Sequence, residues 1–253
     1  MARREAGIPL DEAALLIAAH ADPSLDVAAQ LERLDALSAQ LGQADVDAVC
    51  AFVFETLGVR GDVQTYDDPR NSYLDQVLDR RLGIPISISV LLMEIGRRCG
   101  VSLAGVGMPG HFLVRDPAHP DLLIDAFSGG IRLDRAECAR LLHSVAGAEV
   151  DLPDHMLASV GTRAILARML ANLDHSFRRR GKTESVRWVT RLRAAIPGQS
   201  LAEHVALADG LAALGCYDDA AALLEEAALS PGLPDEAGRL LRTRALSMRA
   251  RFN

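Results

Sequence analysis

One stretch of the sequence, Pro85–Arg97, constrains the fold more than any other, because it is apolar on almost every face of a helix. A helix that is apolar all round must be buried inside a domain. Proline is tolerated in the first turn of a helix, so we expect this central helix to begin at Pro85. Its large apolar residues are Ile86, Ile88, Val90, Leu91, Leu92, Met93 and Ile95. The rest of the chain must supply the layers that cover it.

The residues before the central helix predict a helical layer. A short helix is predicted over Tyr73–Leu82, with Asn71 or Ser72 as its N-cap and Gly83 ending it. Apolar residues also recur at helical spacing in three earlier segments, Ala13–Ala19, Val27–Leu41 and Val46–Leu57.

Short β-like segments follow the central helix, and turn residues separate them: Ser102–Val106, His111–Arg115 and Leu122–Phe127. This pattern predicts a small antiparallel meander. Asp134 and Glu137 then have the spacing of a capping box that starts another helix. The expected fold class is α+β, with a helical N-terminal part and a central buried helix packed against a small antiparallel sheet.

The C-terminal part is helical and carries an internal repeat. Gly181 and Gly215 are 34 residues apart, as are Pro197-Gly198 and Pro231-Gly232. Thirty-four residues is the period of tetratricopeptide repeats. The loop at 151–154 is the best candidate for a domain boundary. We therefore expect residues 1–150 to form the α+β domain and residues 151–253 an all-α, tetratricopeptide-like region.

Charge and composition exclude several classes of protein. The net charge of −7, from 27 basic and 34 acidic residues, argues against a general nucleic-acid binder, which needs a basic surface. No run of about 18 apolar residues and no signal peptide is present, so no membrane partner is predicted. The cysteines are scattered without CxxC spacing, which is typical of reduced thiols and predicts a cytoplasmic protein.

His111 and Asp125 are the residues in which we expect chemistry. They lie in neighbouring predicted strands, opposite a buried helix whose N-terminus faces the meander. A cysteine nucleophile needs this arrangement, because a helix dipole lowers the thiol pKa, an imidazole takes the proton and a carboxylate orients the imidazole. Without a nucleophile, His111 bonded to Asp125 would only hold two strands in register, and both interpretations remain open.

Four motifs between residues 71 and 130 occur in a recognisable order. They are Asn71-Ser72-Tyr73-Leu74, Gly83-Ile84-Pro85-Ile86-Ser87-Ile88-Ser89, Pro109-Gly110-His111-Phe112-Leu113 and Ile124-Asp125-Ala126-Phe127-Ser128-Gly129-Gly130. Together they resemble the SirB family of the transglutaminase-like superfamily, whose members carry a C-terminal tetratricopeptide-like region. The resemblance implies a transglutaminase-like, cysteine-protease-like domain with its core motifs at 71–130.

The resemblance also implies which residues would form the site. His111 matches the family histidine and Asp125 the aspartate, but the position of the nucleophilic cysteine falls on Pro85. Cys99 cannot replace it, because fourteen residues of helix separate the two by about 21 Å. Ser87 points to another face of the helix, and Ser89 lies about 6 Å deeper, so both are poor substitutes.

Asn71 and Gly110 are the candidate binding residues, although Asn71 is also a candidate N-cap. No cofactor and no metal site are predicted. Asp116, His119 and Asp121 lie close together, but Pro117 and Pro120 favour a turn there.

Three hypotheses about function follow from these features. The favoured one is a degenerate, non-catalytic domain that binds a protein or peptide through its cleft and its helical repeats. The second is a hydrolase or acyl-transferase in which Ser87, Ser89 or an activated water works with His111 and Asp125. In the third, the His111–Asp125 pair contributes stability alone. No particular oligomeric state is predicted.

Overall fold

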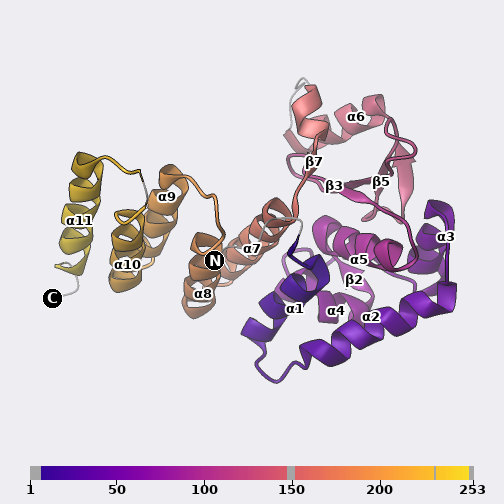
Figure 1. Cartoon of the computed structure of the whole chain (residues 1–253), viewed down its shortest axis with the longest axis horizontal. Helices are drawn as coiled ribbons and strands as arrows, with labels where there is room; N and C mark the ends of the chain where they lie inside the picture. The colour runs from indigo at the N-terminus through magenta and orange to yellow at the C-terminus, as the bar shows by residue number, and fades with distance from the viewer. Residues whose placement is uncertain (1–6, 147–151, 231, 251–253) are drawn as a thin grey trace. The chain divides into compact units, whose positions relative to one another are not determined.

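The computed structural model describes residues 7–146, 152–230 and 232–250, and it divides into two compact units (Figure 1). The first unit ends at Met169 and the second begins at Leu170, so the division falls inside one helix, α7 (Thr162–Arg179). The sequence places the boundary earlier, at 151–154, where Asp151 lies outside the described residues. The later division follows from β7 (Ser159–Val160), which pairs with β3 (Ala104–Val106) in the sheet of the first unit.

The first unit opens with helices that the apolar spacing predicts. Asp26 and Asp45 cap the second and third, since their carboxylates accept the N–H groups of Ala29 and Ala48. The segment predicted as one helix to Leu57 changes form on the way, because a π-helical turn, Phe52–Thr56, follows the α-helical part. The helices are α1 (Leu10–Ala21), α2 (Val27–Leu41), α3 (Val46–Ala51) and α4 (Leu74–Arg80).

The predicted start and end of α4 are wrong. Asn71 and Ser72 belong to a 3-10 turn, Pro69–Ser72, and no side chain caps α4. The helix ends at Arg80, because its C-cap Arg81 adopts the left-handed conformation with φ 58°, two residues before Gly83. Gly83 is instead required by close packing, because a Cβ there would lie 2.8 Å from Ile88 Cγ1 and from Ser87 Oγ. It belongs to a parallel pair of two-residue strands, β1 (Arg60–Gly61) and β2 (Leu82–Gly83).

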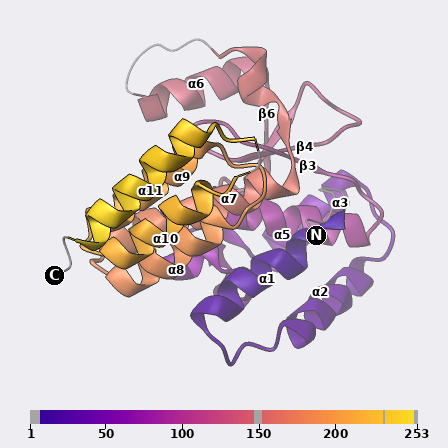
Figure 2. The ribbon, with the colours of Figure 1, turned by 60° about the vertical axis from the view of Figure 1, so that its left-hand side comes forward.

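The central helix is confirmed. It is α5 (Pro85–Arg98), and it begins at Pro85 as predicted. Ile88, Leu91 and Ile95 are fully buried. In the first unit α5 contacts α1, α2, α3 and α4 and, through β3 and β4, the sheet (Figures 1 and 2). Packing on both sides explains why the helix is apolar around most of its circumference.

The predicted meander is confirmed as the centre of a five-stranded antiparallel sheet of order β6-β5-β4-β3-β7. Its remaining strands are β4 (Leu113–Arg115), β5 (Leu123–Asp125) and β6 (Ile131–Leu133). The sequence does not predict β6 or β7, because two or three residues are too few for an alternating pattern. The next helix, α6 (Arg135–Ala146), starts with the predicted capping box, in which Asp134 and Glu137 each accept the other's N–H at 2.8 Å. The fold class is α+β.

The second unit is helical, and its turns repeat at the predicted spacing. Lys182 N–H donates to Phe177 O at 2.9 Å, and 34 residues later Cys216 N–H donates to Leu211 O at 3.0 Å. Gly181 precedes the first of these turns at φ 63°, and the equivalent Gly215 the second at φ 77°. Of the second pair of predicted repeat positions, Pro231 lies outside the described residues. The helices are α8 (Thr183–Ala194), α9 (Leu201–Ala212), α10 (Tyr217–Ala227) and α11 (Asp235–Arg249).

Packing in the second unit is local. In both views α9, α10 and α11 run side by side (Figures 1 and 2), and α10 contacts both of its neighbours. Their shared core includes Ala208, Leu211, Leu224 and Ala245, all buried. Among the helices of the described residues, none is long and apolar enough to cross a bilayer.

Candidate functional site

The structure brings His111 and Asp125 together. In the pairing of β4 with β5, Val114 lies opposite Ile124, and continuing this register sets His111 opposite Phe127. His111 and Asp125 are therefore diagonal neighbours on one face, which long side chains can bridge. His111 Nε2 lies 2.9 Å from Asp125 Oδ1. His111 is 8% exposed and Asp125 is 2% exposed, so the pair is nearly closed to solvent.

Asp125 is held in its ionised form by its hydrogen bonds. Burial by itself raises the pKa of this carboxyl, but the hydrogen bond and charge of His111 and the donors of Ser128 outweigh burial, so the pKa lies below its usual value. The Phe127 and Ser128 N–H groups donate to Oδ1 at 3.0 and 3.2 Å, and the Ser128 hydroxyl donates to Oδ2 at 2.8 Å. The carboxylate thus orients the ring, while His111 Nδ1 has no partner in the described part of the chain.

A tight turn and an arginine position His111. Its N–H donates to Met108 O at 3.1 Å, and Gly110, between Pro109 and His111, has φ 71°. Proline followed by a glycine of positive φ is typical of a type II turn. Gly110, a predicted binding residue, therefore acts here through its backbone. Arg168 of α7 closes the turn, because its guanidinium donates to Met108 O at 2.8 Å and to His111 O at 2.7 Å.

Two aromatic rings lie beside the pair. The Phe127 ring meets the His111 ring edge to face, with centroids 6.3 Å apart, and the Tyr66 ring meets Phe127 in the same way at 5.9 Å. Tyr66 is 45% exposed, so the row of rings runs from solvent to the buried histidine. Sequence reasoning misses Tyr66 and Arg168. No local pattern marks them, since each is defined by contacts with residues far away in the chain.

Neither serine of α5 is placed to act with His111. The Ser87 hydroxyl donates to Asn71 O at 2.5 Å and accepts the Ile84 N–H at 3.1 Å, so it fastens the start of the helix. Ser89 is fully buried and its hydroxyl has no hydrogen-bond partner. Pro85 is buried as well, at the first helical position. Cys99 lies just past the far end of α5, where burial raises its pKa.

The two serines make a matched pair for a stability experiment. Ser87→Ala is expected to lower the free energy of unfolding by about 2 kcal/mol, because it leaves the Ile84 N–H and the Asn71 carbonyl with weakened bonding. Ser89→Ala removes a buried hydroxyl that has no partner, so its effect is expected to stay within about 0.5 kcal/mol or to be stabilising. Urea unfolding of both variants measures the difference. Equal losses would contradict the assigned role of Ser87.

Asn71 is not exposed to a ligand. Its side chain is fully buried and binds four groups of the protein: Nδ2 donates to Asp62 Oδ2 at 3.1 Å and to the carbonyls of Thr65 and Tyr66 at 2.8 and 3.3 Å, and Oδ1 accepts from Arg80 at 3.0 Å. The predicted capping and binding roles are therefore both replaced by a structural one. By holding the Tyr66 carbonyl, Asn71 fixes the loop that carries the outermost ring.

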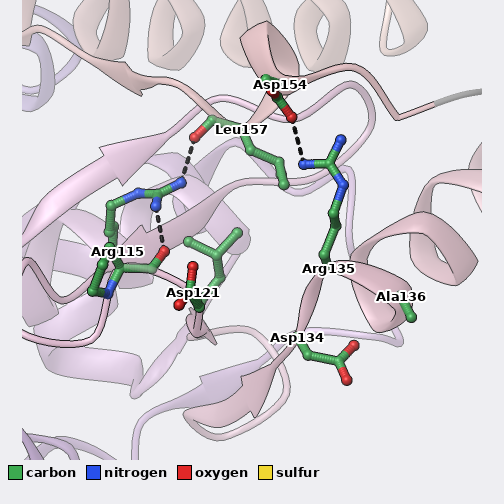
Figure 3. A pocket seen from close by; sticks show the side chains of 9 residues that line it. Arg115, Asp121, Asp134, Arg135, Ala136, Asp154 and Leu157 are labelled. Atoms are coloured by element: carbon green, nitrogen blue, oxygen red, sulfur yellow. Dashed lines mark hydrogen bonds and ion pairs between the residues drawn. The ribbon is translucent and has the colours of Figure 1, made fainter.

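Three pockets lie elsewhere in the first unit. A pocket of about 570 Å³ has Arg115 and Arg135 on either side (Figure 3), and both cations are engaged: Arg115 donates to Leu157 O at 2.6 Å, and Arg135 pairs with Asp154 at 2.8 Å. Neither His111 nor Asp125 lines this pocket or the pockets of about 640 and 450 Å³. The cleft expected around the pair is therefore not one of these cavities.

The group of Asp116, His119 and Asp121 forms the turn that its prolines favour. Asp116 accepts the Ala118 N–H at 2.9 Å and pairs with His119 Nδ1 at 2.8 Å, and His119 N–H donates to Asp116 O at 3.1 Å. These bonds stay within four residues and close a local loop. Over the described ranges, no three His, Cys, Asp or Glu side chains gather as a metal site would require.

Comparison with known proteins shows similarity to the transglutaminase-like superfamily. A family model of the transglutaminase-like superfamily matches residues 20–171. A UPF0162 protein of Xylella fastidiosa is 38% identical over 207 residues, which cover 76% of this chain and 73% of that protein. A UPF0162 protein of Pseudomonas aeruginosa is 35% identical over 172 residues, covering 65% and 63%. Human F-box only protein 21 is 34% identical over 149 residues, 55% of this chain and 23% of that protein. No solved structure shows significant similarity.

Proposed function

Since this chain belongs to the transglutaminase-like superfamily and is related to the UPF0162 proteins, we propose that it is a non-catalytic member that binds a protein or peptide. Within the superfamily we assign it to the SirB type, on the motifs at 71–130. The residues beside His111 would form one part of the binding surface and the C-terminal helices another.

The observation that carries this proposal is the residue at the nucleophile position. Pro85 has no ionisable group and no hydroxyl, and it is buried at the first position of α5. Covalent acyl transfer needs an activated thiol or hydroxyl within hydrogen-bond reach of the histidine. The Ser87 hydroxyl hydrogen-bonds the backbone of Asn71 and Ile84 instead, and the Ser89 hydroxyl makes no hydrogen bond with the described residues. These facts support the absence of covalent catalysis.

The His111–Asp125 pair then serves recognition. Nδ1 has no partner among the residues that the structure describes, and Nε2 is fixed on the carboxylate. A fixed imidazole of this kind offers one donor or acceptor to a ligand, according to its tautomer. The adjoining Phe127 and Tyr66 rings supply apolar area of the sort that anchors peptide side chains. This combination favours a peptide ligand over a small ion.

The second unit supports an interaction role. Its turns at Lys182 and Cys216 have the same hydrogen bonding at a spacing of 34 residues, which favours tetratricopeptide-like repeats over residues 151–253. Stacked helix pairs of that kind present surfaces to partner helices or peptides. The four unpaired cysteines support a reducing, cytoplasmic location.

One observation favours a second candidate, a hydrolase that uses an activated water. A histidine oriented by a buried carboxylate, whose other nitrogen is bound by none of the described residues, has the arrangement of a general base. The non-catalytic hypothesis predicts that His111 and Asp125 hydrolyse no substrate, whereas the hydrolase hypothesis predicts that they do.

The deciding experiment compares the wild-type chain with His111→Ala. We expect p-nitrophenyl acetate to be hydrolysed at the same rate by both, within a factor of two, because no nucleophile or base is in use. We also expect saturable NMR shifts at Phe127 on titration of wild type with N-acetylated hexapeptides of mixed sequence, and their loss in His111→Ala, measured at a temperature at which the spectrum of the variant shows it folded. A rate that falls tenfold or more in the variant would establish the hydrolase instead. Peptides that bind nowhere near Phe127 would refute the binding role.

A further inference from the structure

Arg168 is a partly buried cation that no carboxylate neutralises. Its guanidinium carries five N–H donors, and two of them are used on the carbonyls of Met108 and His111. Three donors remain, and within residues 7–146, 152–230 and 232–250 neither an ion pair nor another hydrogen bond engages them. Arg98 of the first unit, by contrast, pairs with Asp11 at 2.6 Å and with Glu94 at 3.0 Å.

The surroundings of Arg168 make this missing partner costly. One face of the guanidinium lies over the Phe112 ring, with Cζ 5.7 Å from the ring centroid, and Phe112 is itself 1% exposed. Burial lowers the pKa of Arg168, and the nearby Tyr66 is the one group that opposes this effect. A charge taken partly out of water without a counter-charge is destabilising. An anion supplied from outside would remove that cost.

Arg168 adjoins the residues of the proposed binding surface beside His111. Arg168 bonds the backbone carbonyl of His111 itself, and Tyr66, whose ring belongs to the aromatic row, is 45% exposed. Arg168 is only partly buried, and no hydrogen bond engages its Nε within the part of the chain that the structure describes. A planar guanidinium with several free N–H groups matches a carboxylate, which can accept two parallel hydrogen bonds.

We propose that Arg168 binds a carboxylate of the peptide recognised beside His111, either a C-terminal carboxylate or an aspartate or glutamate side chain. This inference rests on the proposed function, and it names the chemical group that the ligand must carry. The carboxylate would neutralise Arg168, and the adjoining ligand atoms would lie against Tyr66 and Phe127. The arginine thereby gains a second role besides closing the Met108–His111 turn.

The test compares ligands that differ in one group, on the wild-type chain. Its probes are N-acetylphenylalanine, its amide, and N-acetylglutamic acid α-amide, titrated while the Arg168 Nε–H and Phe127 signals are followed by NMR. We expect saturable shifts with N-acetylphenylalanine or with the glutamate compound, and binding at least about 10-fold weaker for the phenylalanine amide. Tighter binding of N-acetylphenylalanine would identify a C-terminal carboxylate as the ligand group, and tighter binding of the glutamate compound a side-chain carboxylate. Because the comparison uses the natural chain, it does not depend on any variant folding.

Variants then assign the effect to Arg168. Arg168→Lys keeps the charge and is expected to retain part of the preference for acid over amide, whereas Arg168→Met is expected to abolish it. Arg115→Met is the matched control, since Arg115 also donates to backbone carbonyls of the first unit, and it should leave the preference unchanged. Equal binding of acid and amide would overturn the carboxylate site and leave the peptide-binding function standing. Failure of all three probes to shift Arg168 and Phe127 would overturn both.

Discussion

Replacing Asn71 by alanine is expected to lower the free energy of unfolding by about 4 kcal/mol, because several buried polar groups lose their common partner. The amide lies between the Asp62 carboxylate and the Arg80 guanidinium, and it also binds two backbone carbonyls of the 65–66 loop. Asp62 is 4% exposed, so water cannot readily replace the lost donor. Urea unfolding at neutral pH measures the effect.

Two further variants separate polarity from volume at this position. Asn71→Asp keeps the shape but sets a second carboxylate where Nδ2 lies 3.1 Å from Asp62 Oδ2, so we expect a comparable loss at pH 7. Gln64→Ala, in the exposed part of the same loop, is the control and should change stability by less than about 0.5 kcal/mol. If Asn71→Ala cost no more than the control, the network would contribute nothing to the fold.

Replacing Asp125 by alanine is expected to cost about 3 to 4 kcal/mol. The change removes the acceptor of four donors, from His111, Phe127 and Ser128, in a region where Asp125 is 2% exposed. His111 would also lose the contact that orients its ring. Peptide binding beside His111 should therefore weaken in parallel, which NMR titration checks.

Asp125 is also expected to make the stability of the folded chain fall at acidic pH. The pKa of Asp125 is lowered in the folded chain from its usual 3.8, so the folded state favours the ionised form. Its contribution to stability is then complete above about pH 4 and is lost as the pH falls through the lower, folded pKa. The stability difference between wild type and Asp125→Asn should accordingly be constant from pH 7 to 5 and shrink below pH 4. A difference that grew on acidification would mean that the folded pKa is raised instead.

Local patterns in the sequence were enough to predict the central helix and the strand contacts of the first unit. Pro85–Arg97 is apolar on almost every face, and the structure buries α5 between helices and sheet for that reason. The His111–Asp125 contact was also predictable, because consecutive antiparallel strands place diagonal neighbours within reach. Both features depend on residues close together in the chain.

The roles of single residues around the pair depended on distant contacts. The sequence predicts Asn71 as an N-cap. In the folded chain its side chain instead hydrogen-bonds Asp62 and Arg80, and its backbone carbonyl accepts from Ser87 at the start of α5. The spacing of Ser87 turns it to another face of the helix and makes it a poor substitute nucleophile, but its actual role, donating its hydroxyl to Asn71 O, follows from the tertiary contact alone. No periodic pattern of residues in the sequence predicts either contact.

The sequence by itself determined the central helix and the meander, because hydrophobic periodicity is a local property. Only the tertiary structure decided that β7 belongs to the first unit and that Arg168 closes the turn before β4. Arg168 lies 57 and 60 residues from the carbonyls it binds. A contact over that separation is set by how the whole unit packs, and a local pattern of residues does not encode it.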